Sequence, residues 1–450
     1  MSAIKSPTCQ PASWQKIFCW LLFIGLFLLL TRIGARHYFR EEAVKAGTFP
    51  VTVGRVIALW AVGLMLLQSL LAARLRVLDR LFGLDGLLFF HRLAGIFTLT
   101  FAFFHPQLMY VSGLKKAGPL SLQQWPLALG GLCIIGLWLL VVSSVWRKFV
   151  ALSYEQWLRL HKIAAPVVLL ALGHMFIIES AMRKGLILGF WVVLLVLWAG
   201  VLLAARVVIP GRRAASEAFV VSAAEKVADN VWQIDLEPEE GVERFDFFPG
   251  QFAFVAIKNP ELTGEEHPFT IASAPSQAKT LQFLIKNSGD WTRKLTSVRA
   301  GDQARVCGPF GVFSACRHRP ANLVMIAGGI GITPMLSTLR QLGAEKSVLP
   351  VKLIWSYQTS AGAPCLGEID DLRGLLPNLE VVKIATREPA GENVGVRRLD
   401  RATLAKILPA FKPGDLVMLC GPVAMMHETR QTLRSLGYPG SAILSEEFSF

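Results

Sequence analysis

Two stretches decide the fold of the first half of this chain: HRLAGIFTLTFAFFH at residues 91–105 and HKIAAPVVLLALGH at residues 161–174. Each is largely apolar and has a histidine at both ends, and imidazoles inside lipid-spanning helices usually mark function. With a rise of about 1.5 Å per residue, each pair spans roughly 20 Å. Two such helices side by side place two histidine pairs at two membrane depths, where each pair can hold a haem iron from both sides. The alternative is four independent histidines hydrogen-bonded inside a bundle. The matched pairs favour ligation by four residues: His91, His105, His161 and His174.

The period of an α-helix places His91 and His105 on one face, but it does not do so for His161 and His174. Fourteen steps of about 100° return nearly to the same face, whereas thirteen steps miss it by about 140°. We therefore expect the second helix to be distorted, and Pro166 supplies a reason for a kink. Pro106 directly follows His105 and is expected to bend the first helix.

Composition divides the chain in two. Hydrophobic residues make up 53% of it, and the net charge is +14. Uncharged apolar runs predict six transmembrane helices, at residues 17–31, 56–73, 93–114, 117–146, 163–178 and 186–205. The first run could instead be a signal peptide, although no clear cleavage site follows it. After residue 210, short β-like runs alternate with Gly and Pro turns, which is typical of soluble domains.

Charge and cysteine content exclude several classes. The basic residues are scattered through membrane loops and the soluble half, so they do not indicate nucleic-acid binding. Seven cysteines without a C-x-x-C pair indicate neither a disulfide framework nor a zinc site. Positive-inside counting decides the orientation only weakly. If the soluble half uses a nicotinamide cofactor, it must face the cytosol.

A flavin site is indicated by three motifs in a fixed order. The first is HPFTIASAP at residues 267–275, whose strand can lay Phe269 on an isoalloxazine ring, with Thr270 or Ser273 reaching the flavin N5 or a phosphate. The second is KNSGDWT at residues 286–292, where Gly289 is expected to leave backbone N–H groups free for a pyrophosphate before a helix at residues 293–298. GPFG at residues 308–311 follows. Each motif alone is compatible with an ordinary barrel turn.

A dinucleotide crossover comes next, in LVMIAGGIGITPM at residues 323–335. An apolar strand leads into Gly329-x-Gly331-x-x-Pro334, and a helix follows. We expect Thr333 to be the N-cap of this helix and Pro334 to occupy its first turn. Further strands are expected at residues 351–356 and 416–420. The last ends in Cys420-Gly421-Pro422, where a nicotinamide would lie.

These motifs together resemble the NADPH oxidase and ferric reductase superfamily over nearly the whole chain. The resemblance implies a multidomain membrane protein: a six-helix transmembrane bundle with two b-type haems at residues 1–210, then a ferredoxin-reductase-like module. That module would comprise an antiparallel β-barrel FAD domain at residues 215–318 and an α/β Rossmann-like NAD(P) domain at residues 319–450. It also implies that His91 with His161 holds the inner haem and His105 with His174 the outer one.

The implied activity is transmembrane electron transfer from cytosolic NADPH or NADH through FAD and the two haems. The small-molecule acceptor outside is expected to be dioxygen, giving superoxide, and the alternative is a ferric chelate or another small acceptor such as a quinone. A transporter or receptor with a degenerate reductase tail is a third class, which the intact glycines oppose. No calcium-binding loop or obligatory regulatory subunit is evident, so an oxidase would resemble the small bacterial kind. We expect a bacterial-type inner membrane, contact with lipid, and the reductase module in the cytoplasm.

One departure concerns the nicotinamide cofactor. Family members that prefer NADPH place an arginine after the second dinucleotide strand, whereas this chain has Gln358 there. We therefore expect weak discrimination between NADH and NADPH, with Ser356 or Arg387 as partial substitutes for the phosphate contact.

The remaining candidate residues follow from the motifs and the resemblance. Phe450, a terminal aromatic, is expected to cover the flavin, and Cys420 to lie at the nicotinamide. Arg55, near the outer end of the second helix, is either a snorkelling interfacial residue or a contact for a haem propionate or oxygen. The full set of expected cofactor-binding residues is His267, Pro268, Phe269, Thr270, Ser273, Lys286, Gly289, Thr292, Gly328, Gly329, Gly331, Thr333, Pro334, Cys420, Gly421, Pro422 and Phe450.

Overall fold

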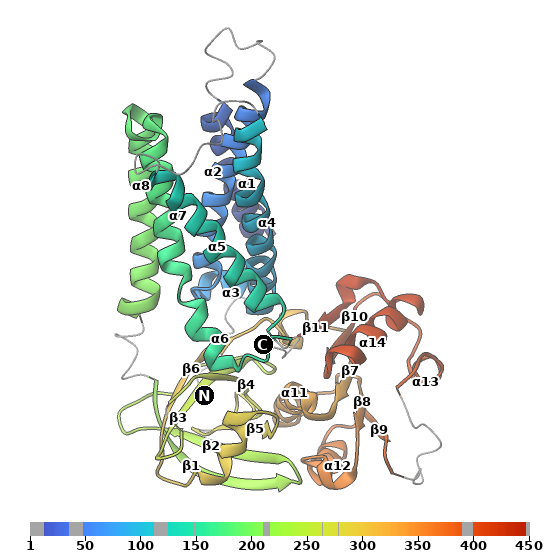
Figure 1. Ribbon diagram of the computed structural model, residues 1–450. Helices are drawn as coiled ribbons and strands as arrows, with labels where there is room; N and C mark the ends of the chain where they lie inside the picture. Colours follow the sequence, from blue (N-terminus) through green and yellow to red (C-terminus); the bar gives the residue numbers. More distant parts are fainter. Residues whose placement is uncertain are drawn as a thin grey trace. The chain divides into compact units, whose positions relative to one another are not determined.

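The chain forms two compact units, one helical and one mixed. The computed structural model describes residues 13–35, 48–111, 125–147, 149–209, 217–262, 264–277, 279–388 and 399–446. The helical unit comprises Ala12–Pro210, and the second unit contains Gly211–Phe450. Figure 1 shows the helices of the first unit in blue to green and the second unit in yellow to red.

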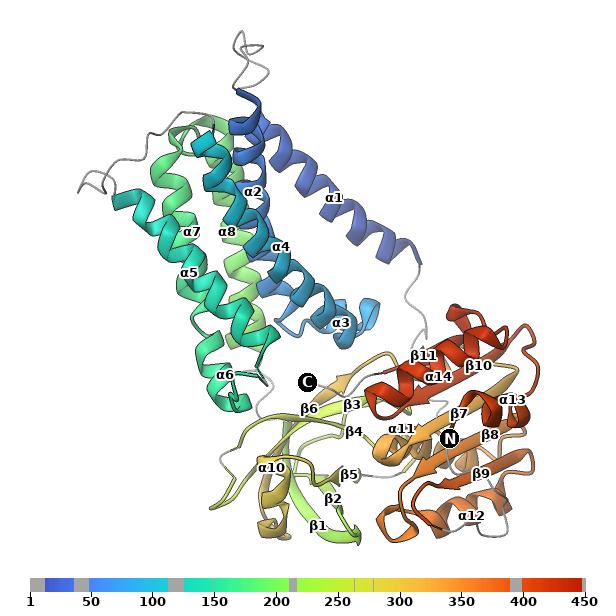
Figure 2. The same ribbon diagram turned by 45° about the vertical axis from the view of Figure 1, so that its right-hand side comes forward.

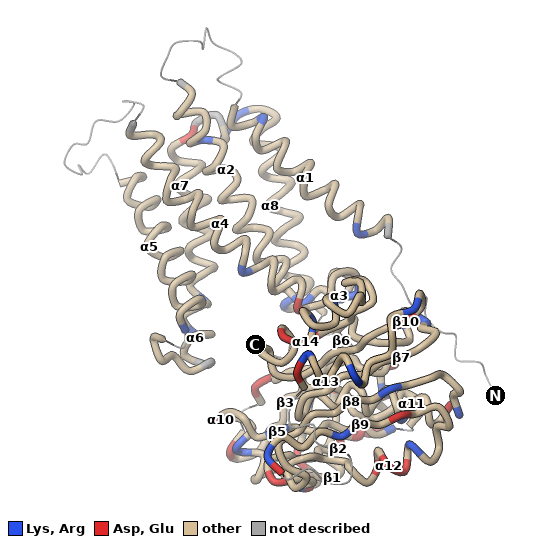
Figure 3. The backbone as a smooth tube through the Cα atoms, turned by 90° about the vertical axis from the view of Figure 1, so that its right-hand side faces the viewer, with Lys and Arg blue, Asp and Glu red and all other residues tan. Residues whose placement is uncertain are grey.

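The helical unit confirms the expected six membrane spans. Among the described residues, six helical segments are long and apolar enough to cross a membrane. Figure 3 shows these helices almost uniformly tan, with charged residues gathered at their ends. Their outward side chains are large and hydrophobic, as lipid contact requires. The helices are α1 (Ser13–Ala35), α2 (Thr48–Leu71), α3 (Arg76–Phe82), α4 (Leu84–Val111), α5 (Trp125–Val145), α6 (Tyr154–His161), α7 (Ala164–Ile178), a 3-10 turn η2 (Ser180–Arg183), α8 (Gly185–Leu203) and a π-helical turn η3 (Ala204–Val208).

Small residues bring the membrane helices close together. A Cβ on Gly34 of α1 would lie 2.9 Å from Val56 of α2, and a Cβ on Gly136 of α5 would lie 2.5 Å from Val167 of α7. Such contacts let backbones approach where lipid supplies no hydrophobic drive between helices. The indole N–H of Trp60 also donates to Thr31 Oγ1 across 3.0 Å. Helix α1 is therefore packed along α2 as part of the bundle.

The membrane span that carries His161 and His174 is broken, as the 13-residue separation of these histidines requires. Helix α6 ends at His161, and α7 begins at Ala164. Pro166 has no N–H to donate to Lys162, whose carbonyl instead accepts a longer bond of 3.4 Å from Ala165. The expected distortion is confirmed. It lies at the start of α7, where a proline in the first turn is tolerated.

The first half of the second unit is an antiparallel barrel, confirming the sequence prediction. Its strand order is β4-β3-β6-β1-β2-β5. The two ends of this order are joined by an antiparallel bridge between Ile271 and Phe283. Alternating apolar residues of the strands fill one buried core. The strands are β1 (Ala218–Ala228), β2 (Val231–Pro238), β3 (Phe252–Lys258), β4 (His267–Thr270), β5 (Leu281–Lys286) and β6 (Gln303–Phe310).

The second half is a doubly wound α/β domain, again as expected. Its parallel sheet has the order β11-β10-β7-β8-β9. Helices α11 and α12 pack on one face and α13 and α14 on the other (Figure 2). The order reverses between β7 and β10, and in such sheets ligands bind at the carboxyl ends beside this switch point. The elements are β7 (Asn322–Gly328), α11 (Thr333–Ala344), β8 (Val351–Tyr357), α12 (Leu366–Leu375), β9 (Leu379–Ala385), α13 (Arg401–Ile407), β10 (Asp415–Cys420), α14 (Val423–Ser435) and β11 (Ile443–Ser445).

The proposed domain limits fall between these elements. The helical unit ends at Pro210. The limit proposed at residues 318/319 lies between the last barrel strand, β6, and the first strand of the nucleotide sheet, β7.

Candidate functional site

The four paired histidines face each other in the predicted combination. The ring centres of His91 and His161 are 6.0 Å apart, and those of His105 and His174 are 6.5 Å apart. We call these the first and second histidine pairs. His91 and His105 both lie on α4, separated by about 21 Å at the helical rise.

Backbone carbonyls fix the tautomer of three of these histidines. The Nδ1 atoms of His91, His105 and His174 lie 3.0, 2.9 and 2.9 Å from the carbonyl oxygens of Gln68, Gly54 and Pro126, respectively. A carbonyl oxygen can only accept, so each Nδ1 carries the proton and each Nε2 keeps its lone pair. Histidines that ligate metals are typically oriented in this way.

His161 is held differently. Its Nδ1 is buried without a hydrogen-bond partner among the described residues. The Trp157 ring instead packs against it, with centres 5.0 Å apart and planes 34° apart. The Trp157 indole N–H donates to Ser144 Oγ of α5 across 3.1 Å. Aromatic packing therefore orients this imidazole.

The two pairs fit a six-coordinate haem iron. An iron between two imidazole nitrogens at about 2 Å, each with its ring centre about 1.1 Å behind, separates the ring centres by roughly 6 Å. Both observed separations agree with this value. No group of three or more His, Cys, Asp or Glu in the described part of the chain could hold a metal ion. A haem iron needs two protein ligands because the porphyrin supplies its other donors, so two opposed histidines suit haem.

Gly130 on α5 makes room for His174 and was missed in the sequence. A Cβ at this position would lie 2.9 Å from Cε1 and 3.0 Å from Nδ1 of the His174 ring. Its neighbour Gly131 has open space at the same position. Gly130 lies one helical turn after Pro126, whose carbonyl accepts from His174, so the same part of α5 both bonds and encloses this ring.

Arg55 is paired, which the sequence did not predict. Its Nε lies 3.4 Å from Oε2 of Glu179, the residue that caps the carboxyl end of α7. Arg55 directly follows Gly54, the partner of His105, and Glu179 lies five residues after His174. The ion pair is thus placed beside the second histidine pair.

An aromatic cluster surrounds the first flavin motif. The ring of Phe269 lies 5.5 Å from Trp291, and the His267 ring lies 4.5 Å from Trp291, centre to centre. Trp291 is buried and belongs to the second motif, so the two motifs meet through their aromatics. Phe269 is only half-buried and lies on β4 next to Pro268. A flavin on Phe269 remains a proposal, and Trp291 was missed.

The hydroxyls of the first motif are enclosed. Thr270 and Ser273 are both buried. Ser273 Oγ accepts from the backbone N–H of Gln282 across 3.2 Å, so it braces the loop after β4. Its contact with a flavin stays a prediction.

The turn of the second motif differs from the expectation. Thr292 Oγ1 accepts from the N–H groups of Ser288 and Gly289, both at 2.9 Å, and donates to the Gly289 carbonyl. The N–H of Gly289 is therefore already bonded, and the Thr292 hydroxyl is fully used. The helix begins earlier than expected, as α10 (Asp290–Arg293), because this cap closes the turn. Lys286 is exposed at the end of β5.

The glycine turn after β7 serves two purposes. A Cβ on Gly331 would lie 2.4 Å from the Cys420 carbonyl oxygen, and one on Gly421 would lie 3.0 Å from Gly328. These three glycines, Gly328, Gly331 and Gly421, pack the turns after β7 and β10 against each other. Gly329 has a φ of +53° and faces open space, so it is the glycine that leaves room for a ligand.

The prediction that Thr333 caps α11 is wrong. A 3-10 turn, η7 (Gly329–Ile332), runs straight into the helix, so Ile332 occupies the cap position in helical conformation. Thr333 Oγ1 instead donates back to the Ile330 carbonyl across 3.1 Å. Pro334 lies in the first turn, as expected.

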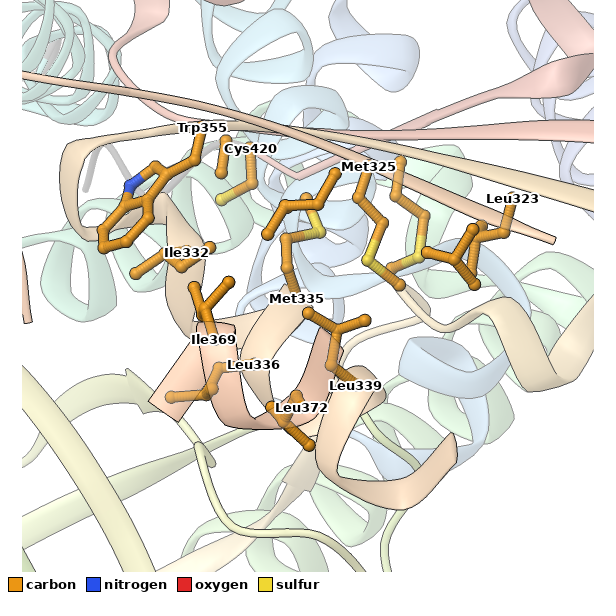
Figure 4. Packing of buried hydrophobic residues seen from close by; sticks show 14 of the residues in the cluster. Leu323, Met325, Ile332, Met335, Leu336, Leu339, Trp355, Ile369, Leu372 and Cys420 are labelled. Carbon is orange, nitrogen blue, oxygen red and sulfur yellow. The ribbon is translucent and has the colours of Figure 1, made fainter. Parts of the chain in front are cut away.

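Cys420 is enclosed by the core rather than exposed in a cleft. Figure 4 shows it beside Trp355 and Met325. Burial, with a further contribution from the Glu446 carboxylate, raises the pKa of the Cys420 thiol well above its usual value. The thiol is therefore neutral. Glu446 is itself buried, and a Cβ on Gly311 of the GPFG motif would lie 2.8 Å from its carboxylate. This carboxylate, missed in the sequence, joins the two halves of the reductase unit.

Phe450 and Gln358 were expected to meet the flavin and the nicotinamide cofactor, respectively. Phe450 lies outside the described residues, so its cover over the flavin stays a prediction. Gln358 directly follows β8, and its carbonyl accepts from the backbone N–H of Arg387 across 3.0 Å. Arg387 is exposed, and its contact with a 2′-phosphate stays a prediction.

Hydrogen bonds from Arg340 and Ser337, together called the clasp, connect the barrel to α11. Arg340 donates to both oxygens of Glu368 on α12, at 2.5 and 2.8 Å, and to the Ala272 carbonyl at 2.9 Å and Gln282 Oε1 at 2.6 Å. Ser337 Oγ donates to the Ser273 carbonyl across 2.7 Å. The helix that follows the glycine turn is thus bonded to the loop of the flavin motif.

Comparison with known proteins identifies three domains in this chain. Residues 57–172 match the ferric reductase like transmembrane component, residues 217–334 an FAD-binding domain, and residues 325–431 the oxidoreductase NAD-binding domain. The chain has the NADPH oxidase and ferric reductase architecture. It is a multipass membrane protein with a carboxyl-terminal reductase module and the domain set of an oxidoreductase.

The relatives match chiefly the reductase half. The propane 2-monooxygenase reductase component of Mycolicibacterium goodii is 26% identical over 235 residues, covering 51% of this chain and 66% of that protein. The flavohemoprotein of Bordetella pertussis is 26% identical over 226 residues, covering 47% of this chain and 56% of that protein. The chain thus spans at most about two thirds of these relatives. The flavohemoglobin structure from Malassezia yamatoensis has a TM-score of 0.52 at 20% identity, covering 93% of this chain and 99% of that chain, and this likeness concerns the fold alone.

Proposed function

We propose that the protein transfers electrons from cytosolic NADH or NADPH, through FAD and two b-type haems, to dioxygen on the outer side of a bacterial-type inner membrane. One observation carries the proposal. Two histidine pairs with ring centres 6.0 and 6.5 Å apart lie in one chain with FAD- and NAD-binding domains. Within the described residues of the helical unit, no other feature explains why two imidazoles lie opposite each other at two places along α4.

The bound groups supply redox chemistry that the amino acids lack: FAD accepts two electrons as hydride and releases them singly, and haem carries single electrons. The chain binds and orients these groups. His91 with His161 would hold the inner haem, and His105 with His174 the outer one. Phe269 would lie against the isoalloxazine, and Gly329 would leave room for the dinucleotide. The turn of Gly421 and Pro422, which follows the buried Cys420, would border the nicotinamide.

His105 and His174 would both be used in holding the outer haem, so dioxygen would meet the neighbouring residues of the chain. The residues beside the second histidine pair would then control the reaction. Arg55, oriented by Glu179 at 3.4 Å, would place a positive charge where an anionic product forms.

A second candidate is reduction of a ferric chelate. It is favoured by the match of residues 57–172 to the ferric reductase like transmembrane component. The same donor and the same haem ligands would serve it, so only the acceptor differs.

One experiment separates these functions. Purified protein is given NADH or NADPH, and superoxide-dismutase-sensitive cytochrome c reduction is compared with ferric-chelate reduction. Dismutase-sensitive reduction as the faster process supports the oxidase. Faster chelate reduction that dismutase does not affect replaces it with the second candidate. No nicotinamide oxidation with any acceptor would reject both and favour a non-redox protein.

A further inference from the structure

The adenosine end of a dinucleotide has a defined place in this sheet. Strand β8 lies next to β7, and Ser356 pairs with Gly328 at the carboxyl edge. The Trp355 indole N–H donates to the Gly329 carbonyl across 3.1 Å, so the end of β8 also fixes the glycine turn. In dinucleotide-binding folds, an acidic side chain at this position bonds the ribose 2′-hydroxyl, whereas an arginine accommodates a 2′-phosphate.

An acidic side chain reaches this position from the next strand. Both oxygens of Glu388 accept hydrogen bonds from Ser360, one from its N–H and one from its hydroxyl, each at 2.7 Å. Ser360 begins the short turn after β8. The segment after β9 runs beside the end of β8, because Thr386 N–H donates to the Tyr357 carbonyl across 2.8 Å. The Glu388 carboxylate is thus held at the end of β8.

The charge of this carboxylate is not neutralised by its partners. Within the described residues, the hydrogen bonds of Glu388 come from the neutral groups of Ser360. The nearby Asp370, in contrast, is paired with Lys383 at 2.7 and 2.8 Å. Each oxygen of Glu388 also keeps a lone pair for a further donor, such as a ribose hydroxyl.

We propose that Glu388, oriented by Ser360, contacts the 2′ position of the adenosine ribose and makes this protein prefer NADH to NADPH. The proposal rests on the proposed function, in which a nicotinamide dinucleotide is the electron donor. It replaces the weak discrimination expected from Gln358 alone. A 2′-hydroxyl can donate to the carboxylate, whereas a 2′-phosphate carries about two negative charges and is repelled by it. The exposed Arg387 carries the opposite charge and would act against this repulsion.

The test uses purified full-length protein and three forms: wild type, Glu388→Gln and Glu380→Gln. The control Glu380 lies at the amino end of β9, whereas Glu388 follows the carboxyl end of that strand, so Glu380→Gln removes an equal charge at the opposite edge of the sheet. Glu380 Oε1 lies 2.9 Å from Lys352 Nζ, so the control also breaks an ion pair. Values of kcat/KM are measured for NADH and NADPH. We expect wild type to favour NADH by about tenfold or more, and Glu388→Gln to raise kcat/KM for NADPH about tenfold, as removal of one close like charge predicts. Glu380→Gln should match wild type.

A binding measurement keeps this test independent of electron transfer. Calorimetry compares ADP-ribose with 2′-phospho-ADP-ribose. Tighter binding of ADP-ribose to wild type, lost in Glu388→Gln, supports the proposal. Equal preference in wild type and Glu388→Gln overturns it while leaving the proposed function intact. If neither fragment binds any form, the nucleotide site itself is wrong, and the proposed function fails with it.

Discussion

Single hydrogen bonds decide which nitrogen each paired histidine presents. Three of the four imidazoles donate their Nδ1 protons to carbonyls of a neighbouring helix, which makes Nε2 the nitrogen that would bind iron. The histidines and their spacing were visible in the sequence. Their acceptors Gln68, Gly54 and Pro126 were not, because a backbone carbonyl carries no residue signature.

Replacing His105 with Leu should reduce the haem content from two per chain to one. Leucine supplies no lone pair, so the second histidine pair is lost, while the first pair and the reductase unit are untouched. NADH-driven flavin reduction should therefore persist. Pyridine haemochrome quantification against protein measures the change, with His427→Leu on the exposed face of α14 as control. If the His105 variant still bound two haems per chain, the second histidine pair would not be a haem-binding site.

Two thiols of the reductase unit, the half-buried Cys365 and the buried Cys420, should resist alkylation. Burial, helped by the nearby Glu368 carboxylate, raises the pKa of Cys365 to about 12, and the pKa of Cys420 is also raised. Thiolate is the nucleophile, so both groups stay protonated and unreactive at pH 8. A raised folded pKa contributes stability below the unfolded value near 9 that is lost as pH rises towards 12. Mass spectrometry after iodoacetamide treatment tests this, and rapid labelling of native Cys420 would contradict it.

At the scale of elements, close approach of helices shapes the second haem pocket. Helix α5 passes the His174 ring at Gly130, where a Cβ would be 2.9 Å away, whereas the Cβ of a residue at position 131 would meet nothing. The sequence predicted the helices well, since long apolar runs have few alternatives. It could not predict this contact, because Gly130 and His174 are far apart in sequence and glycine is common in such helices.

Gly130→Ala should displace the His174 ring and weaken the second haem, and Gly131→Ala should not. The added methyl must push an imidazole that is held by the Pro126 carbonyl. We expect a shifted low-spin haem spectrum or partial loss of one haem in the Gly130 variant. Optical and electron paramagnetic resonance spectra measure it. Identical spectra for both variants would show that the ring is not confined there.

The clasp around Arg340 predicts a coupling between the two halves of the reductase unit. Arg340→Met leaves the Glu368 carboxylate and two barrel acceptors without their donor. The free energy of unfolding should fall by about 3 kcal/mol. We expect FAD to be released at a lower temperature and flavin reduction by NADH to slow. The exposed Arg373→Met on α12 is the control. Adding Glu368→Leu should restore part of the stability, and failure to do so would mean that Arg340 acts elsewhere.

At the scale of the whole molecule, the sequence predicted the architecture and left the details of the turns open. The six spans follow from the long apolar runs, whereas the barrel and the parallel sheet were implied by the family resemblance that the motifs carry. The misplaced cap at Thr333 and the occupied N–H of Gly289 arise from local hydrogen bonds, which several sequences can make. Trp291, Glu446 and Glu388 were missed because their partners come from other segments of the chain.

The central claim is that one chain joins a nicotinamide-dependent flavin module to two bis-histidine haems. The most direct measurement is an anaerobic titration of the purified protein with NADH, with haem and flavin spectra recorded together. The account predicts two haems per FAD, both low-spin and both reduced by NADH alone. Haems that stay oxidised after the flavin is reduced, or a ratio other than two haems to one FAD, would contradict it.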